Sequence, residues 1–226
     1  MRVLLKAVFF DLDNTLVDFM KMKRASVEAS ASAMIDAGLP LSREAVIKRV
    51  FRIYGRHGIE DQRVFQRLLR QALGRIDYRI LAAGIAAYRR VQAGYLTPYP
   101  GVRATLLALK EKGVKLAIVS DAPRMRAWMR LASMNLADFF DAVITLGDAK
   151  LRKPAPTPFK KALQQMRVEP REVVFVGDNP DRDIAGAKAV GMKTAWAKYG
   201  AISGGKPAHK PDFVLRTPQD LLKLFQ

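Results

Sequence analysis

Five short apolar runs rich in β-branched or aromatic residues recur along this chain, and each is followed by a segment with helical character. Unbroken apolar runs of this length suit strands that are buried on both faces, as in a parallel sheet. Their alternation with helices predicts a doubly wound, Rossmann-like α/β core. The runs are "KAVFF" (6–10), "KLAIVS" (115–120), "DAVIT" (141–145), "EVVFVG" (172–177) and "KTAWAK" (193–198).

Glycine and proline mark the expected ends of helices between these runs. A helix over 102–112 should stop at Gly113, and "DRDIAGAKAVG" should stop at Gly191, because glycine is the preferred residue just past a helix end. The segment "TPQDLLKLF" predicts a final helix with Thr217 as its cap and Pro218 in its first position.

Residues 17–95 interrupt the alternation. They carry no strand signal and predict several helices, at roughly 20–37, 42–54, 61–73 and 78–94. We therefore expect an α/β core formed by 1–16 and 96–226, and an all-helical insert over 17–95. The insert is basic, with 15 Lys and Arg against 7 Asp and Glu.

The composition limits the chemistry that is available. The chain of 226 residues has no cysteine, which excludes disulfides, thiolate catalysis and thiolate metal sites. Its two histidines, His57 and His209, are far apart in the sequence, which argues against a histidine-based zinc site. Any metal should therefore be a hard cation bound by oxygen ligands.

The formal net charge of +18 favours anionic partners, whether phosphate esters, nucleic acid or acidic membranes, and does not choose among them. The most apolar internal stretch, 80–88, is about half as long as a bilayer span requires. The start of the chain also lacks the cleavage site of a signal peptide. We expect a cytoplasmic protein with no membrane partner.

Acidic residues follow two of the predicted strands. Asp11 and Asp13 are two residues apart, so both can face one site as the first strand leaves the sheet. Asp178 and Asp183 follow a second apolar run, and the carboxyl ends of parallel strands converge on one crevice. A divalent cation would relieve the mutual repulsion of these carboxylates and let them approach a phosphate. Ser120 and Asp121 follow a third run.

Four segments, "DLDNTLVD", "IVSD", "KPAPTPF" and "GDNPDRD", resemble in order the four motifs of the haloacid dehalogenase superfamily of hydrolases. The pattern covers essentially the whole chain. The helical insert resembles the cap domain of that family, in the subclass where the cap lies between the first and second motifs. The combination of Asp13 and Thr15 resembles the phosphate-processing members rather than the dehalogenases themselves.

The resemblance implies a role for each acidic residue. Asp11 would be the nucleophile that forms an aspartyl-phosphate. Asp13 would protonate the leaving alcohol and later take a proton from the attacking water. A Mg²⁺ ion would be held by Asp11, the backbone carbonyl of Asp13 and Asp178, and Asp183 would orient these ligands.

The resemblance also implies a phosphate site. Ser120 and the backbone N–H groups around Asp121 and Ala122 would hold phosphate oxygens. Lys153 would balance the charge of the nucleophile and of the transferring phosphoryl group. The chain departs from the family pattern at Pro123, which lies close to the start of the helix where many relatives carry other residues.

The insert offers candidates for substrate selection. Two glycines flank Arg56 and His57, which predicts a mobile loop of the kind that selects substrates in this family, although a plain helix–helix connector fits equally well. Lys21, Lys23 and Arg24 are either solvated or directed toward an anionic group of the substrate.

The leading hypothesis is a magnesium-dependent phosphomonoester hydrolase that acts on a small phosphorylated metabolite. A sugar-phosphate mutase would share all four motifs, and a phosphonate hydrolase would need a Schiff-base lysine in the cap, which "MKMKR" leaves open. A hypothesis from another class is a polyanion- or nucleic-acid-binding protein. Against it, no nucleic-acid motif appears and the aromatic residues do not alternate with the basic ones.

Overall fold

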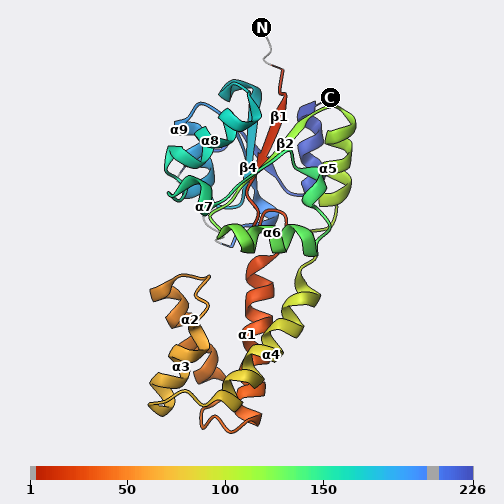
Figure 1. The fold of residues 1–226 in the computed structure, drawn as a ribbon. Helices are drawn as coiled ribbons and strands as arrows, with labels where there is room; N and C mark the ends of the chain where they lie inside the picture. The colour runs from red at the N-terminus through yellow and green to blue at the C-terminus, as the bar shows by residue number, and fades with distance from the viewer. Residues whose placement is uncertain (1–3, 203–208, 226) are drawn as a thin grey trace. The chain divides into compact units, whose positions relative to one another are not determined.

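The central sheet has six parallel strands in this computed structural model, which describes residues 4–202 and 209–225 (Figure 1). Their spatial order is β3-β2-β1-β4-β5-β6, so β1 and β4 lie side by side in the middle. Every residue of β1 is buried, as expected for a strand covered on both faces. The predicted doubly wound α/β class is therefore confirmed. The strands are β1 (Ala7–Phe10), β2 (Lys115–Val119), β3 (Ala142–Ile144), β4 (Val173–Gly177), β5 (Lys193–Ala197) and β6 (Phe213–Leu215).

Five of these strands match the five apolar runs to within one residue at each end. The sixth, β6, was not predicted. It has only three residues and lies at the edge of the sheet, where Val214 is half exposed. An edge strand with one buried neighbour does not need a continuous apolar run, so this segment carries little signal in the sequence.

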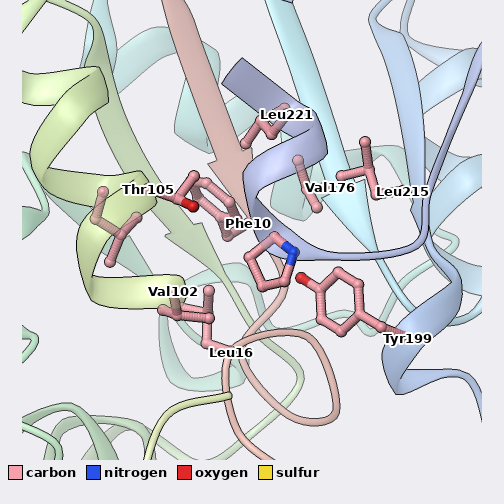
Figure 2. Close-up of a pocket in the computed structure, with 10 residues that line it drawn as sticks. Phe10, Leu16, Val102, Thr105, Val176, Tyr199, Leu215 and Leu221 are labelled. Carbon is pink, nitrogen blue, oxygen red and sulfur yellow. The ribbon is translucent and has the colours of Figure 1, made fainter. Parts of the chain in front are cut away.

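Alternate residues of the central strands point to opposite faces, and different helices cover each face. Phe9 and Phe175 belong to a buried cluster with Phe159 of α8 (Pro156–Met166). On the other face, Phe10 and Val176 lie among side chains of α5 (Val102–Glu111) and of the C-terminal helix η5 (Pro218–Phe225), as Figure 2 shows. The pocket drawn there measures about 10 Å³, which is about the space of one water molecule, so it is a packing defect and not a substrate site.

The helix ends predicted from glycine agree with the structure. Gly113 and Gly191 have φ angles of 71° and 85°, in the left-handed region that glycine adopts without strain. Two predicted helices differ in type. The C-terminal segment after Thr217 is a 3₁₀ helix, and the segment after Asp178 begins as one π-helical turn, η3 (Pro180–Ile184), before α9 (Ala185–Ala189). The other helices of this part are α6 (Arg124–Ser133), α7 (Leu146–Ala149), η1 (Ala137–Phe139), η2 (Pro170–Glu172) and η4 (Lys198–Gly200).

The chain divides into two compact units. The core unit comprises the residues up to Asp18 and from Thr97 onward, and the helical unit comprises Phe19–Leu96. The helical unit contains α1 (Phe19–Asp36), α2 (Arg43–His57), α3 (Val64–Leu73) and α4 (Tyr78–Tyr95). Helices α1 and α4 run along each other, and Ser30 donates a hydrogen bond to the Gly84 carbonyl across their contact (2.9 Å).

One sequence expectation in the helical unit is wrong. Arg56 and His57 do not lie in a loop, because α2 continues through Gly55 and ends at His57. Gly55 adopts the helical conformation, which costs about 1 kcal/mol relative to alanine but does not break a helix. The residue that ends α2 is Gly58, with a φ angle of 90°.

No helix in the described ranges combines the length and the apolar character that are needed to span a lipid bilayer.

Candidate active site

Three buried carboxylates meet where β1 and β4 end. Asp11 follows β1, and its backbone N–H donates to the Val176 carbonyl of the neighbouring strand (2.9 Å). Asp178 follows β4, and Asp183 lies in the π-helical turn behind it. One oxygen from each of the three side chains lies within 4.8 Å of the other two. Residues far apart in the sequence thus form one acidic cluster, because parallel strands bring their carboxyl ends to the same edge.

The approach of Asp183 requires Gly177 at the end of β4. A Cβ atom at position 177 would lie 2.4 Å from the Cβ of Asp183, closer than non-bonded carbons can come. With glycine there, the Asp183 carboxylate accepts a hydrogen bond from the Asn179 backbone N–H (3.0 Å). The π-helical turn therefore folds the acidic side chain back against its own strand.

Lys153 lies inside this cluster and is completely buried. Its Nζ is 2.7 Å from Asp11 Oδ1 and 2.7 Å from Asp183 Oδ1. Burial by itself would lower the pKa of Lys153, but the Asp11 and Asp183 carboxylates outweigh burial and raise that pKa above its ordinary value. Asp121 accepts a hydrogen bond from the Lys153 backbone N–H (3.0 Å), which fixes the start of the lysine loop. Lys153 is thus a permanent cation beside the predicted nucleophile.

The cluster still carries excess negative charge. Burial, followed by the neighbouring carboxylates of Asp11 and Asp183, raises the pKa of Asp178 to about 8. Burial also raises the pKa of Asp183 above its ordinary value. Asp11 Oδ2 and Asp178 Oδ1 are buried, and neither accepts a hydrogen bond from the described residues. Two buried carboxylate oxygens in this state are the donor set of a hard divalent cation, so the residues fit such an ion.

Asp13 lies apart from this cluster. Among residues 4–202 and 209–225, the side chains of Asp11, Asp178 and Asp183 have the geometry of metal ligands, and the Asp13 side chain is not part of that group. Asp13 Oδ2 instead pairs with Arg130 Nη1 of α6 at 2.8 Å. The sequence expectation for Asp13 concerned its backbone carbonyl as a ligand and its carboxylate as an acid and base, and both roles stay predictions.

The loop after Asp13 is held in a tight turn. Asn14 has a φ angle of 60°, in the left-handed region that asparagine tolerates, and its N–H donates to the Val17 carbonyl (2.7 Å). Gly200 packs against this turn so closely that a Cβ there would lie 1.6 Å from the Asn14 carbonyl oxygen. Tyr199 donates to the Thr15 carbonyl (2.9 Å). The C-terminal part of the core unit therefore fixes the loop that carries both Asp11 and Asp13.

Ser120 is buried at the end of β2, the strand on the other side of β1. Its Oγ accepts a hydrogen bond from the Ala122 backbone N–H (3.1 Å). One of the N–H groups that the sequence predicted to face a phosphate is therefore engaged by the serine itself in this structure. Pro123 precedes the first residue of α6 and has no N–H to offer.

Two arginines near the cluster were missed by the sequence reasoning. Arg182 has its Nη1 3.6 Å from Asp121 Oδ2 and its Nη2 4.0 Å from Asp178 Oδ1. Its signal was present, since it is the one basic residue inside the acidic motif "GDNPDRD". Arg130 is nearly fully buried and pairs with Asp13. It lies on the buried side of α6 with Ala127 and Leu131, where the helical pattern leads one to expect an apolar residue.

The candidates in the helical unit have varied surroundings. Arg56 and His57 are exposed at the end of α2. Lys23 is buried, with its Nζ 4.6 Å from the ring centroid of Tyr54 and 5.4 Å from that of Tyr88. Its ammonium group therefore belongs to the interior of the helical unit and not to a solvated surface.

Comparison with known proteins shows the family of this chain. A family model described as haloacid dehalogenase-like hydrolase matches residues 5–191. The chain belongs to this family. It is 34% identical over 224 residues to a glyceraldehyde 3-phosphate phosphatase of Pyrococcus furiosus, which covers 98% of this chain and 93% of that protein. It is 31% identical over 241 residues to a phosphoglycolate phosphatase of Aquifex aeolicus, which covers 97% and 96% of the two chains.

The solved structures agree on the fold. A crystal structure of a HAD phosphatase from Thermococcus onnurineus superposes with a TM-score of 0.71 at 28% identity, over 98% of each chain. The matched family therefore covers the core unit and the helical unit together. The resemblance read from the four motifs is confirmed, and the chain is a hydrolase of the haloacid dehalogenase-like family.

Proposed function

We propose that this chain is a magnesium-dependent phosphomonoester hydrolase that works through an aspartyl-phosphate on Asp11. The observation that carries the proposal is the state of the Asp11 carboxylate. One oxygen is held 2.7 Å from the Lys153 ammonium, and the other is buried and accepts no hydrogen bond from the described residues. A carboxylate so desolvated and oriented is prepared to act as a nucleophile.

Four residues of the chain would each have a separate part in the reaction. Asp11 attacks phosphorus, and the bond to the leaving oxygen breaks. Asp13 gives its proton to the leaving alkoxide and then takes a proton from the water that hydrolyses the aspartyl-phosphate. Lys153 stabilises the negative charge on the transferring phosphoryl group, and Ser120 contributes its hydroxyl to a phosphate oxygen.

The residues that would hold Mg²⁺ are Asp11 and Asp178, with the Asp13 carbonyl as a third ligand and Asp183 as their neighbour. When bound, the ion would polarise the phosphoryl group and screen it from the carboxylates. The fit rests on the two buried carboxylate oxygens of Asp11 and Asp178.

The substrate class follows from the relatives. Two of them are phosphatases of glyceraldehyde 3-phosphate and of phosphoglycolate, both small phosphate esters with a carbonyl or carboxyl group. We propose a substrate of this size for the present chain, in the cytoplasm and without a nucleic-acid partner. The helical unit would act as the cap, and the part of Arg56 and His57 in substrate selection stays a prediction.

The first test is hydrolysis of p-nitrophenyl phosphate with and without Mg²⁺. Asp11→Asn should reduce kcat/KM by at least about 10³-fold, because it removes the group that forms the covalent bond. Asp138→Asn, an exposed aspartate of η1, is the matched control and should retain full activity. Equal activity of the two variants would refute the proposed nucleophile.

A second measurement separates a hydrolase from a mutase. Glyceraldehyde 3-phosphate and phosphoglycolate should release inorganic phosphate in proportion to the substrate consumed. If glucose 1-phosphate is instead converted to another sugar phosphate without release of phosphate, the mutase alternative is correct.

A further inference from the structure

The ion pair between Asp13 and Arg130 has no role in the proposed steps of phosphoryl transfer and hydrolysis. Arg130 Nη1 lies 2.8 Å from Asp13 Oδ2, and the arginine side chain is only 5% exposed. The two residues are 117 positions apart in the sequence. We propose that Arg130 is a positioning residue that holds the Asp13 carboxylate in place as the general acid for the leaving group. This inference rests on the proposed function.

Burying an ion pair costs free energy of desolvation, so a buried pair without a function is unfavourable. A guanidinium group removed from water loses hydration that buried ion pairs rarely restore in full, and an apolar residue of similar volume is often at least as stabilising. Arg130 shares its buried side of α6 with Ala127 and Leu131, which are apolar. A role in positioning Asp13 therefore explains a charged residue in this position better than a contribution to stability does.

The position of Asp13 shows what that task requires. Asp13 is two residues from Asp11, yet its carboxylate is outside the acidic cluster of Asp11, Asp178 and Asp183. A carboxylate that joined the cluster as a further metal ligand could no longer carry a proton to a leaving group. The contact with Arg130 restrains the side-chain torsions of Asp13 while its carboxylate lies outside the cluster.

The anchoring element is itself rigid. Arg130 lies on α6, a ten-residue helix that starts directly after the Ser120 loop. The backbone around Asp13 is fixed by the turn at Asn14 and by the close packing of Gly200. A restrained loop and a restrained helix together define one position for the carboxylate, which is what general acid catalysis demands.

The leaving group provides the test. Cleavage of an alkyl phosphate releases an alkoxide that needs a proton, whereas p-nitrophenolate is stable as an anion and leaves without one. Loss of a correctly placed acid should therefore slow alkyl esters selectively, while general damage to the site should slow both substrates alike. The quantity to compare is kcat/KM, which includes phosphoryl transfer to Asp11 and excludes the later hydrolysis of the aspartyl-phosphate.

For Arg130→Met we expect kcat/KM to fall by about 30-fold for glyceraldehyde 3-phosphate and by less than about 3-fold for p-nitrophenyl phosphate, a share of the 10²–10⁴-fold that general acids contribute. Arg130→Lys keeps the charge and should recover part of the loss. Arg124→Met is the matched control, because it removes another arginine–aspartate pair, with Asp148, from the exposed side of the same helix. It should leave the ratio of the two substrates unchanged.

A double variant ties the effect to Asp13. Asp13→Asn alone should show the same selectivity with a larger size, and adding Arg130→Met to it should change little further, because both act through one carboxylate. Equal losses for both substrates in Arg130→Met, or a full additional loss in the double variant, would overturn the inference. If Arg130→Met does not fold, Arg130→Gln, which removes the charge and keeps a polar side chain, takes its place in the same comparison, and an unchanged substrate ratio there overturns the inference.

The inference and the proposed function fail in different ways. Selectivity in Asp13→Asn without any in Arg130→Met would reject only the role of Arg130. Full activity of Asp11→Asn would reject the proposed function itself.

Discussion

Lys153 of the core unit and Lys23 of the helical unit are both buried, but their ammonium groups have different surroundings. Lys153 Nζ lies 2.7 Å from the carboxylates of Asp11 and Asp183. Lys23 Nζ lies over aromatic rings, at 4.6 Å from the ring centroid of Tyr54, and 3.4 Å from the Tyr54 hydroxyl. The rings of Tyr88 and Phe19 also lie near the ammonium group, with centroids at 5.4 and 5.7 Å.

The difference separates two uses of a buried cation. In the core unit the lysine offsets the negative charge of carboxylates that are needed for another purpose, so its removal leaves a charge without compensation. In the helical unit the ammonium group is held by ring quadrupoles and joins α1, α2 and α4. The first lysine belongs to a site, and the second belongs to the packing of three helices, α1, α2 and α4.

Of the substitutions that test this comparison, Lys153→Met should have the largest effect on stability and activity. Asp11 and Asp183 would then remain buried without their cation, and we expect a loss of about 3–5 kcal/mol in the free energy of unfolding. Turnover of p-nitrophenyl phosphate should fall by about 10²–10³-fold, as when one charge-stabilising donor is removed. Urea unfolding at pH 7 and steady-state kinetics measure the two effects. A stable and fully active Lys153→Met protein would show that the carboxylates do not depend on it.

The positions of the acidic residues along the chain predict much of the candidate active site. A polar residue directly follows each strand, and a parallel sheet brings such ends together, so the meeting of Asp11 with Asp178 follows from the apolar runs that precede them. The family motifs added Lys153, which spacing alone could not connect to Asp11 across 142 positions. Five of the six strands follow from the same apolar runs, whereas their order in the sheet was not predicted.

The remaining features depend on packing between segments that are distant in sequence. The sequence "RMRAWMRLAS" does not by itself predict that Arg130 is buried while Trp128 is 42% exposed. Arg130 is buried because it pairs with Asp13, which lies on another segment of the chain. In the sequence, Lys23 looks like any other cation of a basic insert. The structure shows that its ammonium group lies against the rings of Tyr54 and Tyr88. The sequence states which residues are charged, and tertiary contacts decide which of those charges are buried.

The next effect in size concerns Mg²⁺ and pH, and it should be confined to the core unit. The folded-state pKa of Asp178, about 8, lies above its ordinary value of 3.8. The protonated form is thus favoured by folding, so the contribution is complete below about pH 4 and is lost as the pH rises through about 8. With EDTA present, the melting temperature should therefore fall between these pH values because of this group.

Addition of Mg²⁺ should reverse that loss. A ligand at about 100 times its Kd stabilises the folded state by about 2.7 kcal/mol, and the gain should grow with pH because the ion binds the ionised carboxylates. Asp178→Asn should remove both the pH-dependent loss and the gain from Mg²⁺. Thermal unfolding of the two proteins at pH 5 and pH 8.5, with EDTA or Mg²⁺, gives the comparison. An equal gain from Mg²⁺ in Asp178→Asn would place the ion elsewhere.

The smallest effect is expected for Lys23→Met, and it completes the comparison of the two lysines. The substitution removes a desolvated cation from three aromatic rings while a side chain of similar length continues to fill the space. Such contacts contribute about 1–2 kcal/mol when they are buried, so the free energy of unfolding should fall by that amount. Arg24→Met, one residue further along α1 and exposed, is the control and should change it by less than about 0.5 kcal/mol. The gain in stability from Mg²⁺ should be the same in both variants as in the wild-type protein, since the acidic cluster belongs to the core unit. If Lys23→Met instead costs as much as Lys153→Met, the ammonium group of Lys23 balances a formal negative charge, and the distinction between the two lysines is wrong.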